Sequence, residues 1–463
     1  MSLKKKPVNG MKDILPAEMQ VRDYVISIIK DTYRSFGFTP IDTPSVEHIE
    51  NLSNKQGGEN EKLIFKILKR GEKLKLATAE SEADLVDSGL RYDLTVPLVR
   101  FYANHANELP VPFKALQIGY VWRADRPQRG RFRQFMQCDI DIFGDETNMA
   151  EIELILATAG TLVKLGFKNF QIRINDRRFL GAMASYSGFT ENEYDSLFIS
   201  LDKLDKLGLD GVADELAKNG FPEEKIKKFT ALVGNLYKED GSIGINVKTE
   251  AETEAETEAE TETEAKTETS KIFENNPSAA AKGRENLKWL TNVLINDLDA
   301  SAIKNMTEIL DSVTAAKSGE YEIIFDPTLV RGMSYYTGPI FEINIPEFGA
   351  SCGGGGRYDK LAGKFTGQDV PGVGFSIGFE RIILLLMENG FLVPDQAAKK
   401  AYLLEKGLPD KITSDILLKA QAERDDGRQV LVTRMNKNKR FQKEQLSKEG
   451  YAEITEVYRD KTD

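Results

Sequence analysis

The stretch Arg123-Ala-Asp-Arg-Pro-Gln-Arg-Gly-Arg-Phe-Arg133 carries five arginines and a single carboxylate. It lies between residues 115–122 and 134–143, two apolar-rich runs with the length of β-strands, so the sequence predicts a β-hairpin with a strongly basic loop. Charged hairpin loops often do no more than face solvent, because an exposed charge there costs little. The arginines alone therefore leave two interpretations open, a solvated surface and a binding site for an anion.

The second strand of this hairpin favours a binding site. Side chains alternate between the two faces of a strand, and the two faces differ here in character. One face is apolar and predicts a core, whereas the other places an aromatic ring, an amide and two acids beside the guanidinium groups. The apolar face holds Met136, Cys138, Ile140 and Ile142, and the polar face holds Phe135, Gln137, Asp139 and Asp141. A planar anionic ligand that also carries an amine would suit the polar face.

The composition is that of a globular protein, with 41% hydrophobic and 29% charged residues. The 463 residues allow two or three domains, each with a sizeable core. No apolar run approaches the roughly 20 residues of a membrane helix, and residues 1–7 lack the apolar segment of a secretory signal. We therefore expect a cytoplasmic protein with no membrane contact.

Cysteine and histidine are scarce. Cys138 and Cys352 show no pairing pattern, which suits a reducing compartment. Together with His48 and His105 they do not make up the usual ligand set of a structural zinc site. We expect no zinc and no metal site built by the protein alone.

The net charge of −11 is concentrated in one tract. Residues 249–269 hold nine glutamates and one lysine, a charge of −8, so the other residues sum to −11 + 8 = −3. The folded part is therefore nearly balanced, and any nucleic-acid contact must come from local basic patches. The tract itself has nothing to bury and predicts a surface excursion, either helical or disordered.

The pattern of elements divides the chain into four parts. Residues 1–176 and 321–393 mix strands with helices and are predicted to form one core in two pieces. Between them, residues 177–320 have helical spacing and predict an inserted helical domain. Residues 399–463 alternate strands and helices and predict a small α/β domain. Within that domain residues 434–443 carry five basic residues and no acid, which fits a solvated helix face and an RNA-backbone contact equally well.

Two further stretches of the core suggest a ligand site. Residues 90–97 are predicted to form a short strand that places Asp93 and Thr95 on one face. Arg381 falls in the first turn of a helix that begins after the glycines of residues 372–378. The interaction of a cation with the helix macrodipole at this end is unfavourable by roughly 0.3 to 1 kcal/mol. A phosphate held by both the helix start and the guanidinium would explain why Arg381 is placed there.

These motifs together resemble the histidyl-tRNA synthetases, a branch of the class II aminoacyl-tRNA synthetases. Arg331-Gly-Met-Ser-Tyr-Tyr-Thr-Gly338 and Gly355-Gly-Arg-Tyr-Asp359 are similar to the two signatures of the histidine enzymes. The helix from Pro16 with the proline-containing strand after it, the arginine loop, and residues 374–381 resemble class II motifs 1, 2 and 3. The similarity runs from about residue 9 to residue 387.

The resemblance implies an α+β fold, with an antiparallel sheet flanked by helices that holds ATP in a bent form. It also implies a homodimer that uses ATP with Mg²⁺, histidine and tRNA(His). No Gly-x-x-x-x-Gly-Lys loop occurs in the sequence, which is consistent with an ATP site of a different type. Two departures stand out: Ser334 replaces a usually acidic residue, and the last domain is shorter than the family's anticodon-binding domain.

The resemblance also implies roles for single residues. Arg123 and Arg331 would contact the α-phosphate, Arg331 as the group that stabilises its developing charge. Arg131 and Arg381 would hold the outer phosphates and the adenine, and Asp125 and Phe135 the base. Asp93, Thr95 and Gln137 would bind the α-amino group of histidine. Asp141 and Tyr336, with the neighbouring Tyr335, would bind the imidazole, and Arg126 and Gln128 would face the acceptor end of the tRNA.

Two other classes of protein remain as alternatives. One is a non-catalytic relative that senses histidine, such as the regulatory subunit of ATP phosphoribosyltransferase. Such relatives tend to lose the phosphate-binding arginines and the last domain, both of which this chain keeps. The other is a scaffold or RNA-binding module, which would have no need of Asp141 and Tyr336 together. The enzyme needs no nucleophilic side chain, and the sequence shows no Ser/His/Asp arrangement that suggests one.

Overall fold

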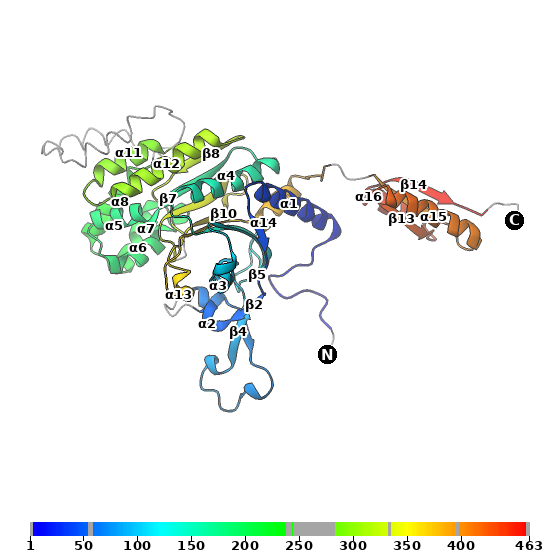
Figure 1. Cartoon of the computed structure of the whole chain (residues 1–463), viewed down its shortest axis with the longest axis horizontal. Helices are drawn as coiled ribbons and strands as arrows, with labels where there is room; N and C mark the ends of the chain where they lie inside the picture. Colours follow the sequence, from blue (N-terminus) through cyan, green and yellow to red (C-terminus); the bar gives the residue numbers. More distant parts are fainter. Residues whose placement is uncertain are drawn as a thin grey trace. The chain divides into compact units, whose positions relative to one another are not determined.

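A computed structural model of the chain describes residues 3–53, 59–237, 243, 283–331, 335–394 and 398–459 (Figure 1). The acidic tract of residues 249–269 and Ser334 lie outside these residues. The chain divides into two compact units, one made of residues 1–13 and 25–386, the other of residues 14–24 and 387–463. No helix among the described residues combines the length and apolar character needed to cross a bilayer.

The larger unit is built on an eight-stranded sheet with the order β1-β5-β6-β11-β10-β9-β7-β8. The strands are β1 (Thr39–Ile41), β5 (Phe113–Trp122), β6 (Gln134–Phe143), β7 (Phe170–Asp176), β8 (Tyr321–Phe325), β9 (Pro339–Ile345), β10 (Ala350–Arg357) and β11 (Gly372–Ile377). The six central strands pair antiparallel. Only the edge strands β1 and β8 pair parallel with their neighbours. The predicted α+β fold with an antiparallel sheet is confirmed.

The predicted hairpin is also confirmed. Strands β5 and β6 pair over their whole length, from Phe113 opposite Phe143 to Trp122 opposite Gln134. Cys138, Ile140 and Ile142 of the apolar face are at most 1% exposed. This face packs against the helices, so the polar face of β6 is turned to the opposite side of the sheet.

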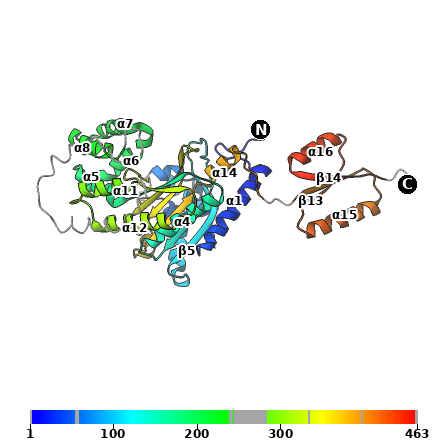
Figure 2. The ribbon, with the colours of Figure 1, turned by 90° about the horizontal axis from the view of Figure 1, so that it is seen from above.

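Helices cover the apolar side of the sheet. These are α1 (Pro16–Ser35), α4 (Met149–Lys164), α11 (Arg284–Val293) and α12 (Ala300–Ala316). Helices α4 and α12 contact each other and lie along the sheet, α4 against β6 and β11 and α12 against β7 and β8 (Figure 2). Val25, Ile29 and Tyr33 lie on one side of α1 and are in the core with no exposed surface.

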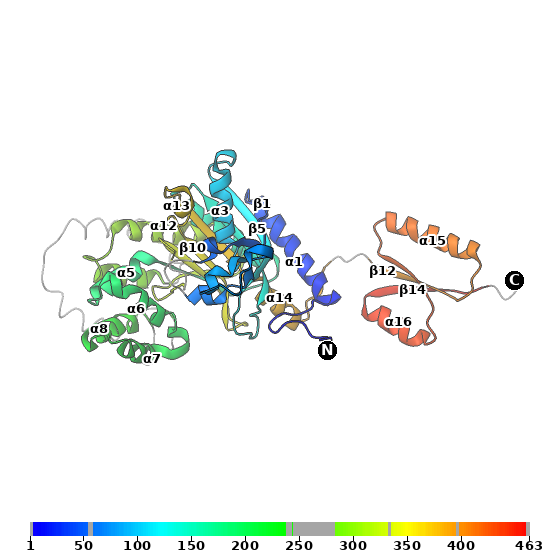
Figure 3. The same cartoon turned by 90° about the horizontal axis from the view of Figure 1, so that it is seen from below.

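The opposite side of the sheet carries α3 (Thr95–His105), the short helices α2 (Ile49–Leu52) and α13 (Gly363–Thr366), and a small sheet β2-β4-β3 (Figure 3). The small sheet consists of β2 (Val46–His48), β3 (Lys66–Leu68) and β4 (Val86–Leu90). Five 3₁₀ turns, Glu59–Leu63, Gly71–Lys73, Glu82–Asp84, Ala106–Glu108 and Glu191–Glu193, complete the short elements of the described chain.

The strand predicted for residues 90–97 is wrong. Strand β4 ends at Leu90, and α3 begins at Thr95. The carboxylate of Asp93 accepts a hydrogen bond from the backbone N–H of Val96 at 3.0 Å, as an acidic residue at a helix start does. Pro97 lies in the first turn of the helix, where its missing N–H is tolerated. The β-branched Thr95 and Val96 are typical of strands, but the hydrogen bond from Val96 to Asp93 favours the start of a helix here.

The residues between β7 and β8, here called the helical insertion (residues 177–320), contain helices as predicted. They are α5 (Arg177–Tyr186), α6 (Tyr194–Leu201), α7 (Leu204–Lys218), α8 (Glu223–Gly234), α11 and α12. Strands β7 and β8 pair directly with each other, so the insertion leaves the sheet and returns to the neighbouring strand. Helix α14 (Phe379–Glu388) follows β11.

The smaller unit contains a parallel three-stranded sheet with the order β13-β12-β14. Its elements are β12 (Lys399–Leu404), α15 (Asp410–Asp425), β13 (Val430–Arg434), α16 (Lys439–Lys448) and β14 (Tyr451–Val457). The two faces of β12 enter two separate apolar clusters, one around Tyr402 and Leu404, the other around Ala401 and Leu403. A parallel sheet needs cover on both faces, and the two helices provide it.

Candidate active site

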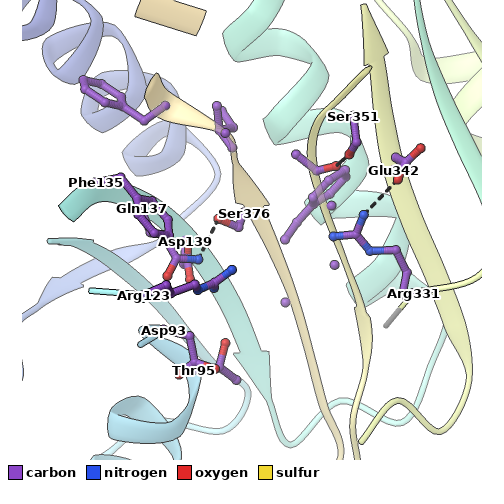
Figure 4. A pocket seen from close by; sticks show the side chains of 18 of the residues that line it. Asp93, Thr95, Arg123, Phe135, Gln137, Asp139, Arg331, Glu342, Ser351 and Ser376 are labelled. Atoms are coloured by element: carbon purple, nitrogen blue, oxygen red, sulfur yellow. Dashed lines mark hydrogen bonds and ion pairs between the residues drawn. The ribbon is translucent and has the colours of Figure 1, made fainter. Parts of the chain in front are cut away.

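A pocket of about 550 Å³ opens on the polar side of the large sheet. Strands β6, β10 and β11 form its floor, and the start of α3, the loop between β5 and β6, and the start of α14 contribute its walls (Figure 4). Twelve of the residues singled out from the sequence line it: Asp93, Thr95, Arg123, Asp125, Arg131, Phe135, Gln137, Asp141, Arg331, Tyr335, Tyr336 and Arg381. Arginines widely separated in sequence thus meet the acids of β6 in one cavity.

Arg126 and Gln128 are placed differently. Both are exposed and neither lines the pocket. Gln128 and Arg131 pair through backbone hydrogen bonds of 3.2 and 2.9 Å, which close the tip of the arginine loop. The two side chains therefore lie outside the cavity, and the tRNA contact predicted for them stays a prediction.

One end of the pocket is acidic. Asp93, Asp139 and Asp141 are 2%, 4% and 2% exposed, and each has a carboxylate oxygen without a hydrogen-bond partner among the described residues. Burial raises the pKa of all three carboxyls, and the pKa of Asp139 is raised further by Asp141 and Asp93. Unpaired buried carboxylates are costly, so this end is built for a ligand that brings positive charge or N–H donors.

Asp141 is oriented by two groups to which the sequence patterns assigned no role. The Tyr358 hydroxyl donates a hydrogen bond to Asp141 Oδ1. Gly374 lies opposite Asp141 in the β6/β11 pair, and a Cβ there would collide with the Asp141 carboxylate. Burial raises the pKa of Asp141 to about 7, while the bond from Tyr358 opposes the rise and Asp93 adds to it. The signature residues 355–359 and the glycines of β11 thus shape the acidic end.

Asp139 lies on the polar face of β6 and lines the pocket, although the family resemblance gave it no role. It lies beside Gln137, and Gln137 Nε2 donates to Ser376 Oγ at 3.4 Å. The alternation along β6 already pointed at Asp139, because Phe135, Gln137, Asp139 and Asp141 share one face. The strand period in the sequence is therefore the signal that identifies this residue.

The other end of the pocket is basic. Arg123 donates from Nε to the Tyr92 carbonyl at 2.8 Å and lies 5.1 Å over the Phe135 ring. Arg131 pairs with Asp125 at 2.8 Å. Burial lowers the pKa of Arg381, and the nearby Arg131 and Arg331 lower it further. Guanidinium groups that repel one another in a cavity provide a site for a polyanion.

Arg381 lies in the first turn of α14, as predicted. Its Nη1 donates to the Ser351 carbonyl, and its guanidinium lies 5.5 Å over the Phe348 ring. Arg129 lies over the same ring at 4.8 Å. A planar group stacked over an aromatic ring can offer its other face to a planar ligand.

Arg331 sits in a space left by a missing side chain. It donates from Nη1 to Glu342 Oε2 at 2.9 Å, and a Cβ on Gly354 would lie 2.7 Å from its Cζ. Burial lowers the pKa of Arg331, but Glu342, Tyr336 and Tyr335 together outweigh it, so that the pKa is raised. The guanidinium is thus held charged above β10 at the edge of the cavity.

The remaining signature arginine has a structural task. Arg357 is buried and forms two bonds with the fully buried Glu151 of α4, at 2.5 and 2.7 Å. It also donates to the carbonyls of Asp145 and Thr147, both at 3.1 Å. A buried ion pair with its remaining donors satisfied fixes two elements to each other. Arg357 therefore links β10 to α4 and does not reach the cavity.

Among the described residues no group of three His, Cys, Asp or Glu side chains is arranged to hold a metal ion. Cys138 and Cys352 are both buried free thiols. The pocket carboxylates are surrounded by tyrosines and by Arg123, which suits an organic cation better than a metal.

The basic helix of the smaller unit, α16, borders a hollow of about 650 Å³. Lys443 and Lys439 pair with Glu456 of β14 at 2.6 and 3.5 Å, and Arg440 pairs with Glu444 at 3.0 Å. Part of the positive charge is thus balanced within the unit. Both interpretations of this helix, solvated face and RNA contact, stay open.

Three comparisons with known proteins identify relatives of this chain. A family model described as histidyl-tRNA synthetase matches residues 10–276 and 249–382. A histidine–tRNA ligase of Leifsonia xyli is 41% identical over 385 residues, which cover 82% of this chain and 80% of that protein. A histidine–tRNA ligase of Christiangramia forsetii is 36% identical over 401 residues, 84% and 78% of the two chains.

Solved structures agree. The crystal structure of a histidyl-tRNA synthetase from Nostoc sp. PCC 7120 has a TM-score of 0.69 at 25% identity, and covers 97% of this chain and 90% of that one. A structure from Bacillus halodurans C, titled an ATP phosphoribosyltransferase regulatory subunit/histidyl-tRNA synthetase, has a TM-score of 0.70 at 18% identity and shares the fold. The chain belongs to the histidyl-tRNA synthetase family.

Proposed function

We propose that the chain is a histidine–tRNA ligase. It activates histidine with ATP to histidyl-adenylate and then transfers histidine to the 3′ end of its tRNA. The observation that carries the proposal is the division of one pocket between three buried, unpaired carboxylates and a cluster of guanidinium groups. Membership in the family supports it, and so does the 41% identity to a histidine–tRNA ligase.

Histidine binds at the acidic end. Its α-ammonium group is held by Asp93, Thr95 and Gln137, and its imidazole by Asp141 and Tyr336, with Tyr335 against the ring. An apolar amino acid would leave these buried groups without partners, which is penalised far more strongly than the loss of a methyl group. Specificity therefore arises from the buried polar groups that a wrong substrate would leave without hydrogen-bond partners.

ATP binds at the basic end as its magnesium complex. Arg123 and Arg331 contact the α-phosphate, whereas Arg131 and Arg381 hold the outer phosphates and the adenine. Phe135 stacks on the base, and Asp125 accepts from it. The ring of Phe135, already 5.1 Å from the Arg123 guanidinium, supports a site in which a planar base and a phosphate lie side by side.

The first step joins two anions. A carboxylate oxygen of histidine attacks the α-phosphorus, the new P–O bond forms, and the bond to the β-phosphate oxygen breaks to release pyrophosphate. The protein's main task is to neutralise charge, which permanently charged, bidentate arginines do well. Arg331 stabilises the α-phosphate oxygens as charge builds there. Mg²⁺ carried by ATP neutralises the pyrophosphate.

In the second step a terminal ribose hydroxyl of the tRNA attacks the carbonyl carbon of the adenylate. The ester bond forms, AMP leaves with the electron pair of the broken C–O bond, and the proton of the hydroxyl is released to solvent. Arg126 and Gln128, exposed at the tip of the arginine loop, face the acceptor end. The enzyme works as a cytoplasmic homodimer without zinc. Residues 1–176 and 321–393 act together as the catalytic core, residues 177–320 as the helical insertion, and residues 399–463 as a short anticodon-binding-like domain.

Histidine-dependent exchange of labelled pyrophosphate into ATP tests the proposal. Wild-type protein is expected to exchange with histidine and with none of the other amino acids. Asp141→Ala is expected to lose exchange while the protein stays folded by circular dichroism. Exchange by that variant at the wild-type rate would contradict the assignment of Asp141.

The same assay separates the alternatives. Histidine binding by calorimetry without exchange would favour a histidine-sensing relative. RNA binding without either property would favour a non-catalytic RNA-binding module. Arg331→Ala adds a second test, because it is expected to bind histidine normally but to lose exchange by about 100-fold or more, in line with the loss of one preorganised charge donor.

A further inference from the structure

The helical insertion reaches the pocket through the turn between α6 and α7. Asp202, the residue that ends α6, lines the cavity, and its carboxyl interacts with Arg331 and Glu342. Three residues later, Asp205 in the first turn of α7 pairs with Arg173 of β7 at 3.0 Å. A segment outside the sheet therefore supplies carboxylates both to the cavity and to the strand beside it.

Arg173 connects this turn to Arg331. It lies opposite Glu342 in the β7/β9 pair, with 3.5 Å between its Nη1 and Glu342 Oε1. The other oxygen of Glu342, Oε2, accepts the 2.9 Å bond from Arg331. Asp205, Arg173, Glu342 and Arg331 thus form an unbroken chain of alternating charges.

The insertion holds Arg173 by a second route. Arg173 Nε donates to Asp326 at 2.5 Å, and Asp326 accepts from the Thr328 hydroxyl at 2.7 Å. That hydroxyl shares a 2.6 Å hydrogen bond with Tyr237, which follows α8. Asp326 is fully buried and Arg173 nearly so, and charges in such surroundings interact more strongly than exposed pairs. Two points of the insertion therefore fix the orientation of one guanidinium.

The register of the sheet explains why Arg331 depends on this chain. Arg173, Glu342 and Gly354 are successive partners across β7, β9 and β10. Gly354 has no side chain, so the Arg331 guanidinium lies in the open position at the end of this row. Glu342 forms a hydrogen-bonded ion pair with Arg331, whereas Asp202 interacts with Arg331 through its charge alone among the described contacts.

We propose that the helical insertion positions Arg331 for adenylate formation through the ion-pair chain Asp205–Arg173–Glu342–Arg331. Asp205 and, through Thr328 and Asp326, Tyr237 hold Arg173 so that it contacts only Oε1 of Glu342, at 3.5 Å, which leaves Glu342 Oε2 to hold Arg331. When Asp205 loses its charge, Arg173 turns further onto Glu342 and competes with Arg331 for it. Glu342 and Asp205 are then positioning residues. The inference rests on the role proposed above for Arg331.

The test compares Asp205→Asn, Glu342→Gln and the double variant by pyrophosphate exchange. We expect kcat to fall about three- to ten-fold in Asp205→Asn and about ten-fold or more in Glu342→Gln. A misplaced catalytic group lowers the rate of the chemical step more than it weakens substrate binding. The KM for histidine stays within about two-fold, because the acidic end is unchanged. The double variant is no slower than Glu342→Gln alone, as residues on one route are not additive.

Two controls keep the test sharp. Asp205→Glu keeps the charge and is expected to restore kcat, a recovery that a loss of folding would not give. Glu223→Gln removes the exposed ion pair of Glu223 with Lys227 on α8, neither of which lines the pocket, and is expected to leave kcat unchanged. The Asp205 side chain is 71% exposed, so its replacement by the isosteric amide leaves the fold intact, and thermal melting checks this.

Two results would overturn the inference: wild-type kcat in Asp205→Asn, or a double variant whose defect equals the product of the single defects. Failure of the underlying function looks different, since wild-type protein would then show no histidine-dependent exchange at all. If the wild type exchanges and Arg331→Ala does not, but Asp205→Asn and Glu342→Gln behave as wild type, only the positioning chain is wrong.

Discussion

Replacing Asp141 by asparagine should stabilise the ligand-free protein while it destroys the histidine site. The substitution keeps the shape of the side chain and removes a charge that is buried, 2% exposed, and close to the carboxyls of Asp93 and Asp139. The amide can still accept the hydrogen bond from Tyr358. A buried charge that helps to bind a ligand lowers the stability of the fold when the ligand is absent.

The magnitude follows from the pKa of Asp141, which burial raises from an ordinary value of 3.8 to about 7. A folded-state pKa above the unfolded one means that the folded protein binds the proton more tightly. The stabilisation is therefore complete below pH 4 and is lost as the pH rises through 7. The two units between pH 5 and pH 7 correspond to about 2.7 kcal/mol, an upper limit because Asp93 and Asp139 titrate with Asp141 as a coupled set.

The assay is the thermal unfolding of wild type and Asp141→Asn at pH 5, 6, 7 and 8 without ligands. The wild type should lose stability relative to the variant as the pH rises across this range. At pH 8 the melting temperature of the variant should be several degrees above that of the wild type. Asp87→Asn, at an exposed position of β4, should follow the wild type at every pH. Equal shifts of Asp141→Asn at pH 5 and pH 8 would refute the electrostatic account.

Saturating histidine should make the wild type more stable than Asp141→Asn, the reverse of the order expected without a ligand. Saturating histidine stabilises only the protein that binds it, so the wild type should gain and Asp141→Asn should not. Pyrophosphate exchange on the same samples should be lost in the variant. A variant that is stabilised at pH 8 yet exchanges normally would separate the charge of Asp141 from histidine binding.

Two further predictions concern Asp139 and Arg357, to which the family resemblance assigned no role. Asp139 lies in the pocket beside Gln137, one of the residues proposed to hold the ammonium group, so its charge should also attract that group. Asp139→Asn should therefore raise the KM for histidine about ten-fold and leave the KM for ATP unchanged, because one charge-assisted contact is worth about 1.5 kcal/mol or more. An unchanged KM for histidine would show that Asp139 only supports the strand. Arg357→Met should lower the free energy of unfolding by about 3 to 5 kcal/mol, since it leaves the fully buried Glu151 without its partner. Urea titration measures this, and a loss below 1 kcal/mol would contradict the buried pair.

The sequence predicted those parts of the molecule that local patterns determine. The alternation along residues 134–143 predicted both the strand and which of its faces is buried, because the side-chain period of a strand follows from its geometry. The family resemblance assigned substrate contacts to side chains far apart in the chain, and twelve of them line one pocket. Local reasoning failed at residues 90–97, where β-branched residues suggested a strand and a carboxylate at position 93 starts a helix instead.

What the sequence could not predict is which strands are neighbours. Glu342 becomes the partner of Arg331 because β9 lies between β10 and β7 in the sheet, and Arg173 is brought beside Glu342 from about 170 residues away. No periodicity within either segment carries that information. Tyr358 and Gly374 gain their roles beside Asp141 in the same way, through the order and register of β6 and β11.

The charge distribution of the pocket also argues for how the two substrates are combined. Like charges gather at each end. Burial, and after it the repulsion between these like charges, shifts the pKa values away from the charged forms, upward for Asp139 and downward for Arg381. In the proposed arrangement histidine relieves the repulsion at the acidic end and ATP relieves it at the basic end, so each substrate gains free energy from like charges that the fold already holds together. Histidyl-adenylate carries the ammonium group and the phosphate in one molecule and relieves both at once. It should therefore bind more tightly than either substrate, which would keep the reactive intermediate in place until the tRNA arrives.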